Sequence, residues 1–179
     1  MKLNRLRHGL LTGLLVAVIS GPALAAEKSV KIIMTWSGDG SIHSISPDRL
    51  LFMGEFEGIM YAEKADGELD AAFASCPATQ YIDTGSKRTE AKGHCNIAIS
   101  GEDTVFADWT CEGKLGACKG KFTLTGGTGK FKGVTGSSDL TIRSVLSTVA
   151  AGMSSGSVVR STSGLAILPK LTYKLAAGK

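Results

Sequence analysis

The segment that most constrains the fold of this chain is a glycine-rich stretch at residues 121–136, KFTLTGGTGKFKGVTG. Its first half alternates polar and apolar residues, which is the pattern of a β-strand with one buried face. Its second half is rich in glycine, which marks backbone that adopts positive φ or packs closely against another segment. We therefore interpret the segment as a strand that runs into a structural turn. The glycines of this turn are Gly126, Gly127, Gly129, Gly133 and Gly136.

A nucleotide-binding loop is the alternative interpretation of these glycines. Gly127, Gly129 and Gly133 are spaced G-x-G-x-x-x-G, whereas the dinucleotide fingerprint is G-x-G-x-x-G at the start of a helix. No helical pattern follows, and the Gly-Lys-Ser/Thr ending of a phosphate loop is missing. We thus expect a tight turn with Phe131 tucked inward, and no cofactor.

Residues 126–136, GGTGKFKGVTG, resemble the glycine turn of the allene-oxide-cyclase-like barrels, whose pattern is roughly GGTGxFxGxxG. The likeness to the dirigent-like barrels is weaker, because those proteins usually carry an arginine in the segment that is Gly133 to Gly136 here. Both families fold as eight-stranded antiparallel barrels related in shape to the calycins, and bacterial exported members often have no assigned activity. The resemblance implies this fold and makes a homo-oligomer plausible. No catalytic residue of either family can be placed on this sequence, so their chemistry is not inferred.

The first 25 residues have the composition of a secretory signal peptide. Lys2, Arg5 and Arg7 precede an apolar run at 9–19, and the small-residue stretch Ala23-Leu24-Ala25-Ala26 provides an A-x-A cleavage site. The run is shorter than the roughly 20 residues that span a bilayer, so we expect no transmembrane anchor after cleavage. The sequence predicts a signal peptide at 1–25, a single domain at 26–179, and export to the periplasm or the extracellular space.

Removal of the signal peptide changes the charge of the protein. Its three basic residues account for most of the formal net charge of +4, and the mature chain is left at +1. A domain with nearly balanced charge gives no general reason to expect a nucleic acid or an anionic membrane as partner.

The four cysteines form an even set in a chain that is predicted to be exported, which favours two disulfides. Three connectivities are possible, and we favour Cys76 with Cys95 and Cys111 with Cys118. The second pair brackets residues 112–117, which look like the tip of a hairpin. The closely paired C-x-x-C spacing of a zinc site is absent, so we expect no metal.

Strand-like runs fill the mature chain, with almost no helical periodicity. Turn signals separate them, including Gly38-Asp39-Gly40, residues 65–67 and residues 83–86. Pro169 interrupts the last run, which is either two strands or one bent edge strand. The pattern predicts an all-β protein, a single antiparallel eight-stranded barrel with two disulfides. The predicted strands are 30–36, 50–62, 68–76, 93–100, 104–112, 119–125, 137–150 and 157–174.

Alternation in the second strand separates two faces. Phe52, Phe56 and Met60 share one face with two glycines, Gly54 and Gly58, that make room for the rings. The opposite face carries Glu55 and Glu57, which are our only candidates for a catalytic carboxylate pair. Paired carboxylates on a strand are usually solvated, because acid–base chemistry also requires a cleft and shifted pKa values.

The histidines offer no clear catalytic site. We expect His43 to be exposed in a serine-rich loop, and His94 to share a strand with Cys95. Neighbours in a strand point to opposite faces, so these two cannot form a Cys-His dyad.

The leading functional hypothesis is a non-enzymatic exported barrel that binds a small apolar or amphipathic molecule in its interior. One alternative is a cyclase or isomerase that acts on a bound apolar substrate. The other is a structural or interaction module with a filled core. The candidate lining residues of the interior are Phe52, Phe56, Phe73, Phe106, Trp109 and Phe122.

Overall fold

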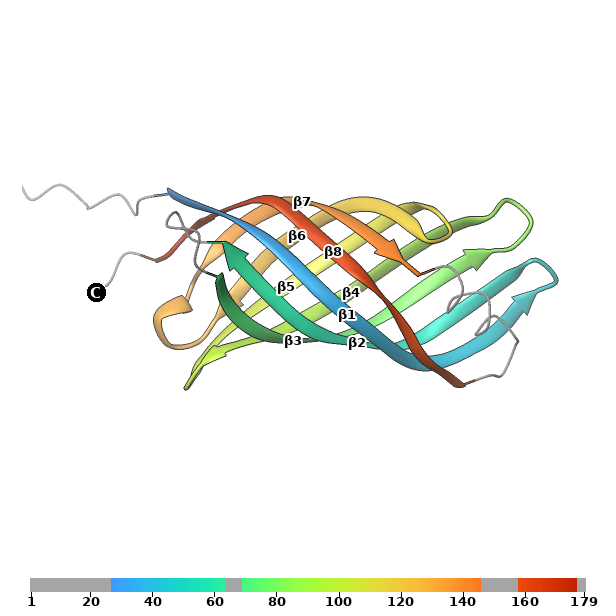
Figure 1. The fold of residues 1–179 in the computed structure, drawn as a ribbon, viewed down its shortest axis with the longest axis horizontal. Coiled ribbons are helices and arrows are strands. Elements are labelled where there is room, and N and C mark those ends of the chain that lie inside the picture. Colours follow the sequence, from blue (N-terminus) through green and yellow to red (C-terminus); the bar gives the residue numbers. More distant parts are fainter. Residues whose placement is uncertain (1–26, 64–68, 146–157, 177–179) are drawn as a thin grey trace, which may run out of the picture.

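The structure, a computed structural model, describes residues 27–63, 69–145 and 158–176 (Figure 1). The predicted signal peptide at 1–25 and the predicted turn at 65–67 lie outside these residues. The described chain forms a closed barrel of eight antiparallel strands with two disulfides, which confirms the predicted fold class.

Each strand pairs with the next one in sequence, and the first and last strands close the barrel by pairing with one another. Figure 1 shows this closure as the blue and red ribbons that run side by side. The strands are β1 (Glu27–Ser46), β2 (Arg49–Glu63), β3 (Leu69–Asp83), β4 (Arg88–Ser100), β5 (Asp103–Lys114), β6 (Ala117–Gly127), β7 (Thr135–Ser144) and β8 (Val158–Lys174).

The two ends of the barrel differ in their connections. We call the end that carries the β6–β7 connection the turn end, because the glycine turn forms that connection. The β4–β5 connection, the start of β1 and the end of β8 lie at the same end (Figure 1). The opposite end, the hairpin end, carries the tight β1–β2, β3–β4 and β5–β6 turns.

Side chains alternate between the barrel interior and solvent along every strand, as a half-buried sheet requires. The alternation is complete from Arg88 to Asn96 in β4 and from Val105 to Glu112 in β5, where every second residue is buried. In β2, Phe52 and Met60 are buried and Phe56 packs against both parts of the core. The predicted inward face of β2 is therefore confirmed.

The expected turn at Gly38-Asp39-Gly40 is wrong, because β1 continues through these residues to Ser46. Gly38 lies opposite Phe56 in the β1–β2 register, and a Cβ at Gly38 would collide with the ring of Phe56. A Cβ at Gly40 would likewise meet the ring of Phe52. These glycines therefore make room for aromatic rings from the neighbouring strand, and they do not reverse the chain.

The predicted end of β3 and the predicted nature of the last strand also need correction. β3 does not stop at Cys76 but continues past Pro77 to Asp83. β8 is one strand, and it is not an edge strand, because it pairs with both β1 and β7. Val30 pairs with Leu171 and Ile32 with Leu168, so β8 has one extra residue in the interval that contains Pro169. Such a bulge tolerates a proline, which has no N–H to donate to the ladder.

The glycine turn has the positive-φ backbone that its sequence predicts. Gly129 and Gly133 adopt φ values of 51° and 73°, where a side chain costs energy. Between them lies a short 3₁₀ turn, Gly129–Phe131. The turn continues the β5–β6 ladder, since the Thr128 N–H donates to the Thr104 carbonyl at 2.8 Å. Phe131 packs inward against the core, as predicted.

Both predicted disulfides are present, and no described cysteine is free. Cys76 and Cys95 link β3 to β4, and Cys111 and Cys118 link β5 to β6. Leu115 and Gly116 form the tight turn within the second bridge, so the predicted hairpin tip is confirmed. All four cysteines are buried and face the interior.

Candidate ligand-binding site

The barrel interior contains a cavity of about 580 Å³ at the turn end. This volume is within the range of about 300–1,000 Å³ that is typical of small-molecule sites. Side chains of β1 to β6, of the glycine turn and of β8 form its wall. The main apolar residues of this turn-end cavity are Val30, Ile32, Met60, Ala62, Ala72, Ile97, Ile99, Val105, Phe122, Leu124, Phe131, Val134, Leu171 and Tyr173.

Two features of the sequence shape the turn-end cavity. The glycine turn contributes Phe131 and Val134 to its wall, so the positive-φ backbone of this turn positions part of the site. Among the described residues, Lys28, Glu63 and Asp70 line the cavity where the flanking strands begin or end. The cavity thus combines an apolar interior with charged residues at its rim.

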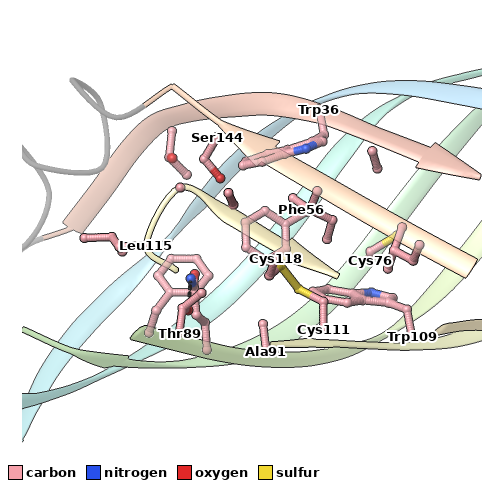
Figure 2. Close-up of a pocket in the computed structure, with 18 of the residues that line it drawn as sticks. Trp36, Phe56, Cys76, Thr89, Ala91, Trp109, Cys111, Leu115, Cys118 and Ser144 are labelled. Carbon is pink, nitrogen blue, oxygen red and sulfur yellow. Dashed lines mark hydrogen bonds between the residues drawn. A yellow bond between two sulfur atoms is a disulfide. The ribbon is translucent and has the colours of Figure 1, made fainter. Parts of the chain in front are cut away.

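A second and smaller cavity of about 100 Å³ lies toward the hairpin end. Its wall contains a cluster of rings, with the centroid of Phe56 5.1 Å from that of Trp36 and 6.1 Å from that of Trp109. Figure 2 shows the two indoles on opposite walls with Phe56 between them. Phe52 and both disulfides complete much of the lining. We call this space the aromatic cavity.

No charged side chain is found among the described residues that line the aromatic cavity. Its polar side chains include those of Gln80, Thr89, Ser144 and Thr162. Gln80 Nε2 donates to Thr89 Oγ1 at 2.6 Å, and that hydroxyl donates to the Tyr81 carbonyl at 3.1 Å. Trp36 Nε1 is buried and has no hydrogen-bond partner among the described residues. Phe122 lines both cavities, so it lies between them.

Four of the six predicted lining residues face the interior. Phe52, Phe56 and Trp109 line the aromatic cavity, and Phe122 lines both cavities. Whether they contact a ligand stays a prediction.

The other two, Phe73 and Phe106, were predicted wrongly, because they lie on the outer face with exposed fractions of 46% and 41%. Period-two alternation explains both errors. Cys76 faces inward, so Phe73, three positions before it, faces outward. In the same way, Trp109 faces inward and Phe106, three positions before it, faces outward.

The carboxylate pair of β2 lies outside the barrel. Glu55 and Glu57 point to the same side, as predicted, but that side is the exposed outer face. The Ser75 hydroxyl of the neighbouring strand donates to Glu55 Oε1. Neither carboxylate lines either cavity, so the pair cannot act on a molecule in the interior.

The histidines are also on the outside. His43 is exposed, as predicted, but it belongs to β1 and pairs with Leu51, so the expected loop is wrong. His94 and Cys95 point to opposite faces, as predicted. His94 Nδ1 donates to Asp108 Oδ1 at 2.6 Å across the β4–β5 pair, with both side chains more than half exposed.

Several lining residues were missed by the sequence analysis. Trp36, Gln80 and Thr89 line the aromatic cavity, and Tyr173 lines the turn-end cavity. Trp36 could have been found, because it shares the inward phase of Ile32 and Met34 in the first predicted strand. Gln80 carried no such signal, since β3 was expected to end before it.

Acidic residues with shifted pKa values lie away from the cavity walls. Hydrogen bonds from the side chain and then the backbone of Lys130 lower the pKa of Asp103, which anchors the glycine turn. The hydrogen bond and charge of Lys121 lower the pKa of Asp139 on the outer face. These shifts reflect structural ion pairs on the surface.

The described residues contain no group of three or more histidine, cysteine or acidic side chains that could hold a metal ion. No helix within the described part of the chain has the length and apolarity needed to cross a membrane. Comparison of the chain with protein-family models, with curated proteins and with solved structures gave no match.

Proposed function

We propose that this protein is an exported binding protein that holds one small amphipathic molecule in the turn-end cavity. The observation that carries the proposal is the cavity of about 580 Å³ inside the barrel, with a wall made mainly of aliphatic and aromatic side chains. Burial of an apolar ligand surface there is favourable by about 25 cal/mol per Å² of area removed from water, before the costs of binding are subtracted.

The charged rim sets the orientation of the ligand. Lys28, Glu63 and Asp70 border a cavity whose other lining residues are mainly apolar, among them Ile97, Phe122 and Leu124. A polar head group is better solvated at this rim, because burying an unpaired polar group in the apolar interior is costly. The apolar body of the ligand would therefore lie against apolar lining residues such as Phe122, with its head group toward the charged rim.

Export is part of the proposal. The signal-like segment at 1–25 supports it, and so do two disulfides in a chain of this size, because disulfides persist in oxidising compartments. The glycine turn, which resembles that of allene-oxide-cyclase-like barrels, is also compatible with an exported barrel. The alternative is an enzyme that acts on the bound molecule. Recovery of a chemically unchanged ligand would argue against this alternative.

The test uses the oxidised mature chain, residues 26–179, and the fluorescent amphiphile 1-anilinonaphthalene-8-sulfonate, with 1-decanol as a competitor. We expect saturable binding of the dye and its displacement by 1-decanol. Ala72 lines the turn-end cavity, so Ala72→Phe should fill part of it and weaken dye binding at least tenfold.

Ala98→Phe is the matched control, because Ala98 is exposed on the outer face of β4 and the same ring is added outside the barrel. Equal dye affinity in Ala72→Phe and Ala98→Phe would place the dye outside the cavity and refute the proposal. Absence of saturable binding by the wild type would refute it as well.

A further inference from the structure

Phe122 of β6 is the residue that the two interior cavities share. Its side chain is 4% exposed, and among the described residues no other one lines both the turn-end cavity and the aromatic cavity. The strand register places Phe122 opposite Trp109 of β5, which lines only the aromatic cavity (Figure 2). The next inward residue of β6 toward the turn end is Leu124, which lines only the turn-end cavity. A single side chain therefore separates the two cavities along this strand.

Small residues make up much of the partition between the cavities. On β2, β3 and β5, one inward residue lies between a residue that lines the turn-end cavity and one that lines the aromatic cavity. These residues are Gly58, Ala74 and Ala107, and they line neither cavity. A glycine and two alanines extend little beyond the backbone, so they do not reach the middle of the barrel. Larger side chains from other strands must close the partition there.

Phe122 on β6 and Leu168 on β8 are larger side chains in the same partition. In the sequence of β8, Leu168 lies between Leu171, which lines the turn-end cavity, and Ala166, which lines the aromatic cavity. Leu168 is 2% exposed and lines neither cavity, so it is embedded in the partition. Phe122 differs because both cavities reach its side chain. Its ring is therefore the part of the partition that a ligand in the turn-end cavity would meet.

The depth of the turn-end cavity follows from strand geometry. On β1 its lining runs from Lys28 at the rim to Ile32, and Met34, the next inward residue, lines the aromatic cavity. Four residue steps span about 13 Å along a strand, or about 10 Å along the axis of a barrel whose strands tilt by about 40°. An extended carbon chain advances roughly 1.2 Å per bond, from the reach of a polypeptide backbone with three bonds per residue. The cavity therefore has the depth of an extended chain of about eight carbons.

We propose that the ring of Phe122 is the floor of the turn-end cavity and sets the length of its ligand. The protein then selects amphiphiles whose apolar part is no longer than about eight carbons. This inference rests on the proposed function, since it requires a ligand whose head group stays at the charged rim. Beyond Phe122 lies the aromatic cavity of about 100 Å³, whose described lining carries no charge. Removal of the ring would join this volume to the turn-end cavity and admit a longer chain.

The test measures displacement of 1-anilinonaphthalene-8-sulfonate from the oxidised mature chain by 1-hexanol, 1-octanol, 1-decanol and 1-dodecanol. Each carbon that the wild-type cavity buries should raise the affinity about fourfold, from the transfer free energy of a methylene group. The rise should end near about eight carbons, because further carbons meet the ring of Phe122. We expect 1-decanol to bind less than about threefold more tightly than 1-octanol in the wild type, and at least about tenfold more tightly in Phe122→Ala.

Phe131→Ala is the matched control. It removes the same atoms from the wall of the turn-end cavity, and Phe131 does not line the aromatic cavity. This variant should change the affinity for all the alcohols alike and keep the end of the rise at the wild-type length. Phe122→Leu removes the ring but keeps a branched side chain in the core, so its rise should end between those of the wild type and Phe122→Ala. If neither variant of Phe122 folds, the wild-type profile decides alone.

A wild-type affinity that keeps rising through 1-dodecanol would overturn the inference, and so would an unchanged profile in Phe122→Ala. An equal extension of the rise in Phe131→Ala would overturn it too, because a larger cavity, and not the loss of its floor, would then explain the result. Each of these results leaves the proposed function standing if dye binding is saturable and Ala72→Phe weakens it. Absence of such binding refutes the proposed function and this inference together.

Discussion

Asp103 holds Lys130 through both of its carboxylate oxygens. Oδ1 accepts a hydrogen bond from the Lys130 backbone N–H at 3.0 Å, and Oδ2 lies 2.8 Å from the Lys130 ammonium. Asp103 is the first residue of β5, whereas Lys130 lies in the middle of the glycine turn. This contact fixes the glycine turn to β5. The glycine turn also places Phe131 and Val134 in the wall of the turn-end cavity.

The first prediction concerns the pH dependence of this anchor. Lys130 lowers the pKa of Asp103 in the folded protein. The contact therefore stabilises the fold fully above the pKa that Asp103 has in the unfolded chain. This stabilisation is lost as the pH falls through the lower pKa that Asp103 has in the folded protein. Asp103→Asn should lower stability at neutral pH, and the difference from the wild type should shrink in acid. Urea denaturation at pH 7 and below pH 4 measures this. A difference that is constant with pH would contradict the electrostatic account.

The second prediction concerns Gly129. Its φ of 51° is unfavourable for other residues, and a Cβ would collide with the carboxylate of Asp103. We expect Gly129→Ala to lower the free energy of unfolding by at least about 1–2 kcal/mol, the cost of a left-handed conformation for a residue with a side chain. Gly85→Ala is the control, because a Cβ there makes only ordinary contacts. Similar effects of the two substitutions in urea denaturation would show that the turn tolerates a Cβ.

The third prediction separates the two faces of the barrel. Phe56 packs against the rings of Trp36, Phe52 and Trp109 in the interior, whereas Phe73 is 46% exposed on the outer face. Phe56→Ala should lower the free energy of unfolding by about 3 kcal/mol or more. Phe73→Ala should change it by less than about 1 kcal/mol, as expected for a surface position. A larger loss for Phe73→Ala in the same denaturation experiment would contradict the assigned orientation of β3.

The fourth prediction concerns the disulfides. The bridges close chain segments of different length, with sequence separations of 19 for Cys76 and Cys95 and 7 for Cys111 and Cys118. Loop-closure entropy predicts losses of about 3.3 and about 2.5 kcal/mol, respectively, when each pair is replaced by alanines. Denaturation of the two double variants under oxidising conditions checks the order. A larger loss for Cys111→Ala/Cys118→Ala would show that packing around the sulfurs, and not loop closure, dominates.

Local sequence signals were sufficient for much of the fold. The alternation of β2 predicted the inward position of Phe52, Phe56 and Met60 because neighbouring residues of a strand must face opposite sides. The pairing of Cys111 with Cys118 followed from the short hairpin between them. The positive φ of Gly129 and Gly133 followed from the freedom of glycine to adopt this conformation.

Other features depended on which strands lie next to one another. Gly38 and Gly40 resemble a turn in the sequence, yet they lie within β1 because the rings of Phe56 and Phe52 on the neighbouring strand occupy the space of their side chains. The outward position of Phe73 and Phe106 follows from the phase that the buried cysteines impose on β3 and β5. The hydrophobicity of Phe73 and Phe106 favoured the interior, but hydrophobicity does not show which face of the strand a residue lies on.

The sequence by itself determined that the chain forms an all-β barrel with two local disulfides and a glycine turn, since these depend on alternation, spacing and backbone freedom within short segments. The tertiary structure alone decided that the interior is hollow at the turn end, and that a second, smaller cavity lies among the rings of Trp36, Phe56 and Trp109. Closure of the barrel brings side chains from all eight strands around one interior. The space left between them depends on the register of every strand pair, which no single segment of the sequence encodes.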